Sequence, residues 1–127
     1  MSVSAEFREH LGDLFGALGP IRTRRMFGGV GVFLDDAMFA IAVNDTLYMK
    51  ADDELAEAYA AAGSEPFSYG TSTGPRSLPG LMRLPDSALD DADEALDWAR
   101  RSLLPAERAA AEKRAKKARK AARAQGA

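Results

Sequence analysis

The segment between residues 21 and 50 constrains the fold more than any other part of the sequence. Four short apolar stretches follow one another there, over residues 21–27, 30–34, 38–43 and 46–50. The residues between them are Gly28-Gly29, Asp35-Asp36-Ala37 and Asn44-Asp45, which are typical of tight turns. Because such short connections join only antiparallel neighbours, the sequence predicts a four-stranded meander and excludes a βαβ unit.

Helical periodicity flanks this meander on both sides. Apolar residues recur every three or four positions in the segments that follow Ser4, Asp52-Asp53 and Asp90. Serine and aspartate favour the position before a helix, so we expect these residues to begin three helices. Gly19-Pro20 ends the first helix and Gly63 the second, because proline cannot continue a helix and glycine favours its C-terminal cap.

Two further strands are predicted after the second helix, over residues 66–70 and 81–84. The segment 71–80 between them is rich in glycine, serine, threonine and proline, and we expect it to be a mobile loop. Strands flanked by helices predict an α+β domain of two layers, with an antiparallel meander sheet packed against helices. We assign this domain to residues 1–104, since 127 residues are enough for one core and too few for two.

Charge is unevenly distributed along the chain. Residues 105–127 contain eight Lys/Arg and two Glu, whereas residues 1–104 contain nine Lys/Arg and seventeen Asp/Glu. Pro105 suits the first turn of a final helix, and the Ala, Lys, Arg and Glu residues after it favour a solvated helix outside the core. Such a basic tail could solubilise the domain, bind nucleic acid nonspecifically, bind an acidic partner, or dock on the acidic body. Its candidate contact residues are Lys113, Arg114, Lys116, Lys117, Arg119 and Lys120.

Several function classes lack the residues that they need. The chain has no cysteine and one histidine, His10, so it offers no thiolate nucleophile, no histidine metal cluster and no evident catalytic triad. Gly28-Gly29-Val30-Gly31 precedes a predicted strand rather than a helix, which excludes the dinucleotide-binding pattern. We therefore expect a protein that is not an enzyme and needs neither metal nor cofactor. Neither a signal peptide nor a membrane span is predicted, and we expect a cytoplasmic protein.

Arg24, Arg25 and Lys50 are candidate binding residues. Adjacent strand residues point to opposite faces, so Arg24 and Arg25 are expected on two sides of the sheet, with Lys50 at the end of another strand. They could contact an anion or a partner beside the glycine turn, or remain solvated and paired with carboxylates.

The aromatic residues leave a similar choice open. Aromatic rings on a sheet could stack on nucleic-acid bases, or they could pack beneath the helices as part of the core. The residues concerned are Tyr48, Phe67, Tyr69 and Trp98.

The glycine turn belongs to a longer motif, Arg24-Arg25-Met26-Phe27-Gly28-Gly29-Val30-Gly31-Val32-Phe33. Together with Met38-Phe39-Ala40, Leu47-Tyr48-Met49-Lys50-Ala51-Asp52 and Pro66-Phe67-Ser68-Tyr69, it resembles the N-terminal domain of the TfoX/Sxy family. The resemblance covers about residues 10–104. The structural residues of the motif are expected to be Met26, Phe27, Gly28, Gly29, Gly31 and Asp52.

The resemblance implies a two-layer α+β domain and a regulatory role. Full-length members of the family are regulators of natural competence that act with a cAMP-receptor-type transcription factor, and no catalytic residues come with the family. They carry a second, helical domain, where this sequence is expected to have only its basic tail. Arg83-Leu84 also stands before Pro85 where many members have an aromatic pair.

We predict a non-enzymatic regulatory or binding module linked to transcription. It is expected to act through a protein partner such as a transcription factor, through DNA, or through both. The alternative is a small-molecule or anion-binding protein, with a pocket between residues 71–80 and the sheet.

Overall fold

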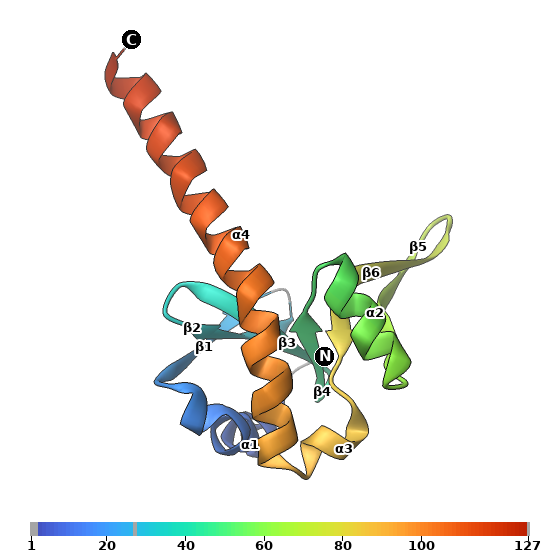
Figure 1. Ribbon diagram of the computed structural model, residues 1–127. Coiled ribbons are helices and arrows are strands. Elements are labelled where there is room, and N and C mark those ends of the chain that lie inside the picture. The colour runs from blue at the N-terminus through green and yellow to red at the C-terminus, as the bar shows by residue number, and fades with distance from the viewer. Residues whose placement is uncertain (1–2, 27, 127) are drawn as a thin grey trace.

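Six strands form one antiparallel sheet in the computed structural model, which describes residues 3–26 and 28–126 (Figure 1). The strands are β1 (Ile21–Met26), β2 (Gly29–Leu34), β3 (Ala37–Val43), β4 (Thr46–Lys50), β5 (Pro66–Thr71) and β6 (Gly74–Arg83). They lie in the order β1-β2-β3-β4-β6-β5. The helices of the described residues are α1 (Ala5–Phe15), the 3₁₀ turn η1 (Gly16–Leu18), α2 (Asp53–Ala61), α3 (Asp86–Leu89) and α4 (Ala92–Gly126). The predicted α+β fold is confirmed.

The predicted meander is confirmed as well, since β1 to β4 follow one another and each is antiparallel to the next. Asn44 and Asp45 both have positive φ, 52° and 57°, which a tight two-residue hairpin turn requires. Asp35 begins the preceding turn with a φ of 54°. Phe27 of the predicted glycine motif lies outside the described residues.

Two helix starts agree with the sequence. The Oγ of Ser4 accepts a hydrogen bond from the backbone N–H of Phe7 at 3.1 Å, which caps α1. The Oδ1 of Asp52 accepts one from the N–H of Leu55 at 2.9 Å and caps α2. After α2, Gly63 has a φ of 91°, as expected for the residue that ends a helix.

The prediction of a mobile loop over residues 71–80 is wrong. These residues complete a hairpin in which β5 and the ten-residue β6 pair from Phe67↔Leu78 to Thr71↔Gly74. Proline is tolerated at strand edges and irregularities, and the register shift after Pro66 leaves Pro79 outside the paired positions. The composition of this segment is therefore compatible with a strand whose backbone is paired on one side.

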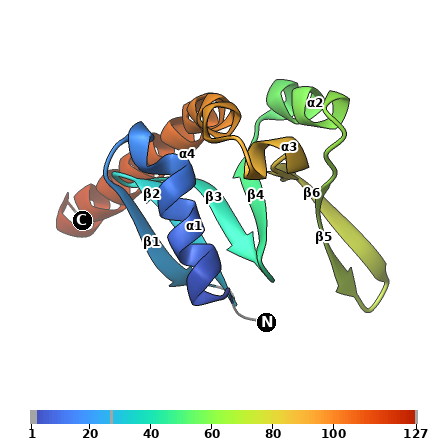
Figure 2. The same ribbon diagram turned by 90° about the horizontal axis from the view of Figure 1, so that it is seen from below.

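All helices of the described residues lie on one face of the sheet (Figure 2). On this face Phe15 of α1 meets Phe39 of β3 edge to face, with ring centroids 5.3 Å apart. Tyr59 of α2 stacks on Trp98 of α4 at 4.2 Å, and its hydroxyl lies 2.7 Å from the Oγ of Ser102. Over the described chain, no helix covers the opposite face of the sheet, which we call the uncovered face.

The predicted start of a separate helix at Pro105 is also wrong, because α4 runs without a break from Ala92 to Gly126. Pro105 and Ala106 are buried, and Ala110 is partly buried against the core. Proline removes one backbone hydrogen bond from a helix interior, and packing on both sides of it offsets that loss. The first turns after Pro105 thus belong to the packed body, and from residue 111 to 126 every side chain is exposed.

The helix expected to begin at Asp90 begins instead at Ala92, as α4, and a short helix, α3, precedes it. Leu89 ends α3, and the Oδ1 of Asp91 accepts hydrogen bonds from the backbone N–H groups of Asp93 and Glu94 at the start of α4. None of the helices described is both long and apolar enough to span a bilayer.

Candidate functional site

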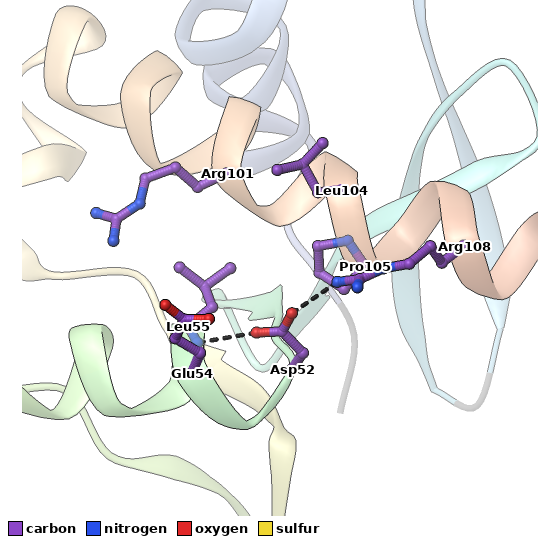
Figure 3. A pocket seen from close by; sticks show the side chains of 7 residues that line it. All are labelled: Asp52, Glu54, Leu55, Arg101, Leu104, Pro105 and Arg108. Atoms are coloured by element: carbon purple, nitrogen blue, oxygen red, sulfur yellow. Dashed lines mark hydrogen bonds and ion pairs between the residues drawn. The ribbon is translucent and has the colours of Figure 1, made fainter.

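Asp52 joins the body of the protein to α4 (Figure 3). One carboxylate oxygen caps α2, and the other accepts a hydrogen bond from the guanidinium of Arg108 at 2.6 Å. The N–H of Leu55 and then the Arg108 guanidinium hold the pKa of Asp52 below its ordinary value. This motif residue therefore has two structural roles, as a helix cap and as an anchor for α4.

A second ion pair forms further along the same helix, between Arg114 and Asp36 in the turn that joins β2 to β3. Its hydrogen bond is the main reason that the pKa of Asp36 is lowered. Both ion pairs of α4 are largely exposed, so they position the helix more than they stabilise it. Arg114, predicted as a ligand contact, is engaged with the body instead of projecting alone.

The exposed end of α4, residues 111–126, forms an arm that projects from the body (Figure 1). Lys113, Lys116, Lys117 and Lys120 occupy helical positions i, i+3, i+4 and i+7, which places them on one face. Arg119 and Arg123 border this face, and Glu112 is the only acid in the arm. In the part of the chain that the structure describes, none of these six cations pairs with a carboxylate.

The arm has the features of an electrostatic contact for a long anion. Its cations extend over about 15 Å from Lys113 to Arg123, at the rise of an α-helix. No Leu, Ile, Val or aromatic residue follows Leu104, so the arm has no large apolar side chain with which to build a dry interface. Its attraction to a ligand must come mainly from charge.

The structure separates the three candidate contact residues in the sheet. Arg24 and Arg25 are both exposed on β1, which is an edge strand, and they point to opposite faces. Arg24 lies on the uncovered face in one row with Gly31, and Lys50 lies on the same face two strands beyond β2. At about 4.8 Å between strands, β1 and β4 are about 14 Å apart, so Lys50 is not beside the glycine turn.

The motif glycines serve the sheet. A Cβ built on Gly29 would lie 2.3 Å from the backbone oxygen of Ala42, which is closer than any side chain permits. At Gly31 the nearest atoms, 3.0 to 3.1 Å from a built Cβ, belong to three side chains that include Met26. Gly28 has a φ of 75°, a conformation that favours glycine. These residues therefore shape the start of β2.

A small cavity lies between the start of α2 and α4 (Figure 3). Its volume is about 230 Å³, and its lining comprises Asp52, Glu54, Leu55, Arg101, Leu104, Pro105 and Arg108. Typical small-molecule sites enclose about 300–1,000 Å³. This cavity is smaller than that range. Residues 71–80, beside which the small-molecule alternative placed its pocket, belong to the β5–β6 hairpin. In the described residues, no three His, Cys, Asp or Glu side chains gather closely enough to share a metal ion.

No local sequence signal indicates that Asp36 and Arg108 help to anchor α4, each with a different partner. The paired residues are 78 positions apart for Asp36 with Arg114, and 56 apart for Asp52 with Arg108. Docking of the tail on the acidic body was one of several open alternatives, and the structure shows it for these two arginines.

Comparison with known proteins agrees with the motif analysis. A family model, the TfoX N-terminal domain, matches residues 13–106. DNA transformation protein TfoX1 from Aliivibrio fischeri (strain ATCC 700601 / ES114) is 38% identical over 56 residues. That alignment covers 44% of this chain and 27% of the relative, so the chain spans far less than the relative's length. The family match includes the whole sheet and ends before the arm.

Proposed function

The chain belongs to the TfoX N-terminal domain family, and we propose that it is a transcription-linked regulatory module that binds duplex DNA and a protein partner. Family membership supports the coarser conclusion of a competence-related, TfoX-like protein. The proposal adds that the arm binds DNA and that the folded body binds the protein partner.

The exposed cationic face of the arm carries the DNA part of this proposal. Lysine and arginine side chains on one helix face can approach successive phosphates and release counterions, which gives affinity without sequence preference. Such binding does not select a promoter by itself. Selection is assigned to a partner of the transcription-factor class, for which Arg24, Arg25 and Lys50 are the proposed contact residues on the body.

Fluorescence anisotropy of a labelled DNA duplex tests the arm. The test variant, which we call the arm-neutralised chain, replaces the six cations by glutamine: Lys113, Lys116, Lys117, Arg119, Lys120 and Arg123. Glutamine favours helix about as well as lysine, so the charge changes and the helix remains. A matched control replaces the four lysines by arginine and keeps the charge.

We expect the native chain and the arginine control to bind duplex DNA at low salt, and the arm-neutralised chain to lose that binding. Equal binding by all three chains would show that the arm is not the DNA contact. Absence of binding by the native chain at low salt would remove the DNA part of the proposal and leave the protein partner.

A further inference from the structure

The described strands contain cations but no acids. Their charged residues are Arg22, Arg24, Arg25, Lys50, Arg76 and Arg83, although the chain as a whole has 19 Asp and Glu. The acids lie instead in the helices, the turns and the short connections. The sheet is therefore the cationic layer of a body whose residues 1–104 are acidic overall.

Strand register shows which sheet residues share the uncovered face. Val30, Ala42 and Leu47 form one row of paired residues and are buried in the core with the helices. The neighbouring row, on the opposite face, runs from Arg24 through the middle strands to Tyr48. Alternation along β1 and β4 and the pairing of Tyr48 with Arg83 place Arg22, Arg24, Lys50 and Arg83 on the uncovered face, with Arg25 on the other. β6 is irregular before Leu81, and Arg76 reaches the uncovered face through its pairing with Tyr69, which lies two positions after Phe67, a contact of Tyr48.

Aromatic rings form a ladder on this same face. The ring of Tyr48 on β4 meets that of Phe67 on β5 edge to face at 5.0 Å, and Phe67 lies 6.2 Å from Tyr69 with the two rings inclined by 22°. Tyr69 is 42% exposed, and Arg76 is its partner across β5 and β6. Further along the face, the guanidinium of Arg22 lies 5.7 Å from the centre of the Phe33 ring.

Most of these cations have no carboxylate to neutralise them. Arg83 pairs with Glu65 at 2.5 Å and with Asp86 at 2.6 Å. For the other four cations of the face, the described chain shows no carboxylate partner: Arg22, Arg24, Lys50 and Arg76. The surface thus combines one exposed ring, Tyr69, and two half-buried rings, Tyr48 and Phe67, with uncompensated positive charge.

We propose that the uncovered face of the sheet binds single-stranded nucleic acid. Unpaired bases of any sequence can stack on aromatic rings, while nearby cations attract the phosphates. Bases in a duplex already stack on one another, so a partly exposed row of rings offers a duplex no stacking partner. A second copy of this face would bring like charges together, which disfavours self-association through it.

This inference goes beyond the proposed function because it concerns another form of nucleic acid and a surface that shares no residue with the DNA-binding arm, although Arg24 and Lys50 of the face are also proposed partner contacts. Besides Arg114, the arm carries six cations and no ring, whereas the face carries rings between its cations. Each surface can be changed without altering the other. Failure of one proposal is therefore distinguishable from failure of the other.

The experiment uses a labelled oligothymidine of about 12 nucleotides, a length within the range that single sheet-based modules contact. Its affinity for the arm-neutralised chain is compared with that of a duplex of equal length by fluorescence anisotropy. Two matched pairs of variants are made in this background. Tyr69→Leu removes a ring that Tyr69→Phe keeps, and Arg24→Gln removes a charge from the face whereas Arg25→Gln removes one from the other side of the same strand.

We expect the single strand to bind more tightly than the duplex. Tyr69→Leu lowers its affinity about 5- to 100-fold and Arg24→Gln about 10-fold, whereas Tyr69→Phe and Arg25→Gln leave it within twofold or so. Thermal melting followed by circular dichroism verifies the fold of each variant. If Tyr69→Leu does not fold, the two arginine variants alone decide the outcome.

Three results would overturn the inference. The first is equal affinity for single strand and duplex, and the second is an equal effect of Arg24→Gln and Arg25→Gln. The third is a dimer in sedimentation velocity that Tyr69→Leu dissociates, in a chain that does not bind oligothymidine. That last result would assign the face to a second copy of the chain.

Discussion

The arm and the uncovered face are both cationic, yet they are built differently. The arm is a solvated helix with four lysines on one face and two arginines bordering it, and no large apolar side chain or body contact accompanies them after residue 114. The uncovered face carries four uncompensated cations on a paired sheet, interspersed with Tyr48, Phe67 and Tyr69. The first surface has charge alone, and the second has charge in a fixed relation to rings.

This difference predicts different ligands and different responses to salt. Charge on a solvated helix attracts any polyanion, and salt screens that attraction strongly. Base stacking on rings adds a contribution that depends little on ionic strength and requires unpaired bases. The extent of the family match agrees with this separation, because it includes the face and ends at residue 106, before the arm.

Salt dependence provides the largest expected effect. With all six arm cations on phosphates, duplex affinity of the native chain falls about 10³-fold between about 50 and 200 mM salt. With four contacts, single-strand affinity of the arm-neutralised chain falls about 50-fold over the same range. Anisotropy titrations at several salt concentrations measure both slopes. Equal slopes would contradict the distinction between the two surfaces.

Substitution of two motif glycines tests whether the face rests on a rigid sheet. Gly29→Ala places a methyl group against the backbone oxygen of Ala42, and we expect it to lower the free energy of unfolding by about 3 kcal/mol. Gly31→Ala meets side chains that can move, and about 1 kcal/mol or less is expected. Urea denaturation measures both values. A larger effect at Gly31 would show that the uncovered face is packed more tightly than its exposure indicates.

Substitution of Asp52 separates its two roles. Asp52→Ala removes the cap of α2 and the partner of Arg108, and we expect a loss of about 1 kcal/mol in the free energy of unfolding. Asp52→Asn keeps a capping oxygen, so its loss should be smaller. Arg108→Ala removes the ion pair alone and should have the smallest effect of the three. Similar losses for Asp52→Asn and Asp52→Ala would show that the carboxylate charge, rather than the cap, matters.

The smallest effect concerns pH. Folding lowers the pKa of Asp36 and Asp52, so the stabilisation by these carboxylates is present above their ordinary pKa of 3.8 and is lost as pH falls through the lowered values. We therefore expect chemical denaturation to require less urea below about pH 4, with less of this decline in the double variant Asp36→Asn and Asp52→Asn. An identical decline in the native chain and the double variant would show that neither carboxylate contributes to it.

Elements whose signals are local could be predicted from the amino-acid sequence alone. Short turns with Asn44 and Asp45 specified antiparallel neighbours, and Ser4 and Asp52 marked two helix starts, because turns and caps depend on residues only a few positions apart. The exposed basic end of the chain was predictable for the same reason, since no large apolar residue follows Leu104.

Features that depend on contacts between distant segments could not be predicted in this way. Packing on both sides of Pro105 keeps α4 continuous, and pairing with β5 turns a glycine- and proline-rich stretch into β6. Register places Arg24 and Tyr48 on one face of the sheet and Arg25 on the other. All helices of the described residues pack on the face of Arg25, which leaves the face of Arg24 and Tyr48 uncovered. These outcomes rest on contacts between residues tens of positions apart, and no local propensity encodes such contacts.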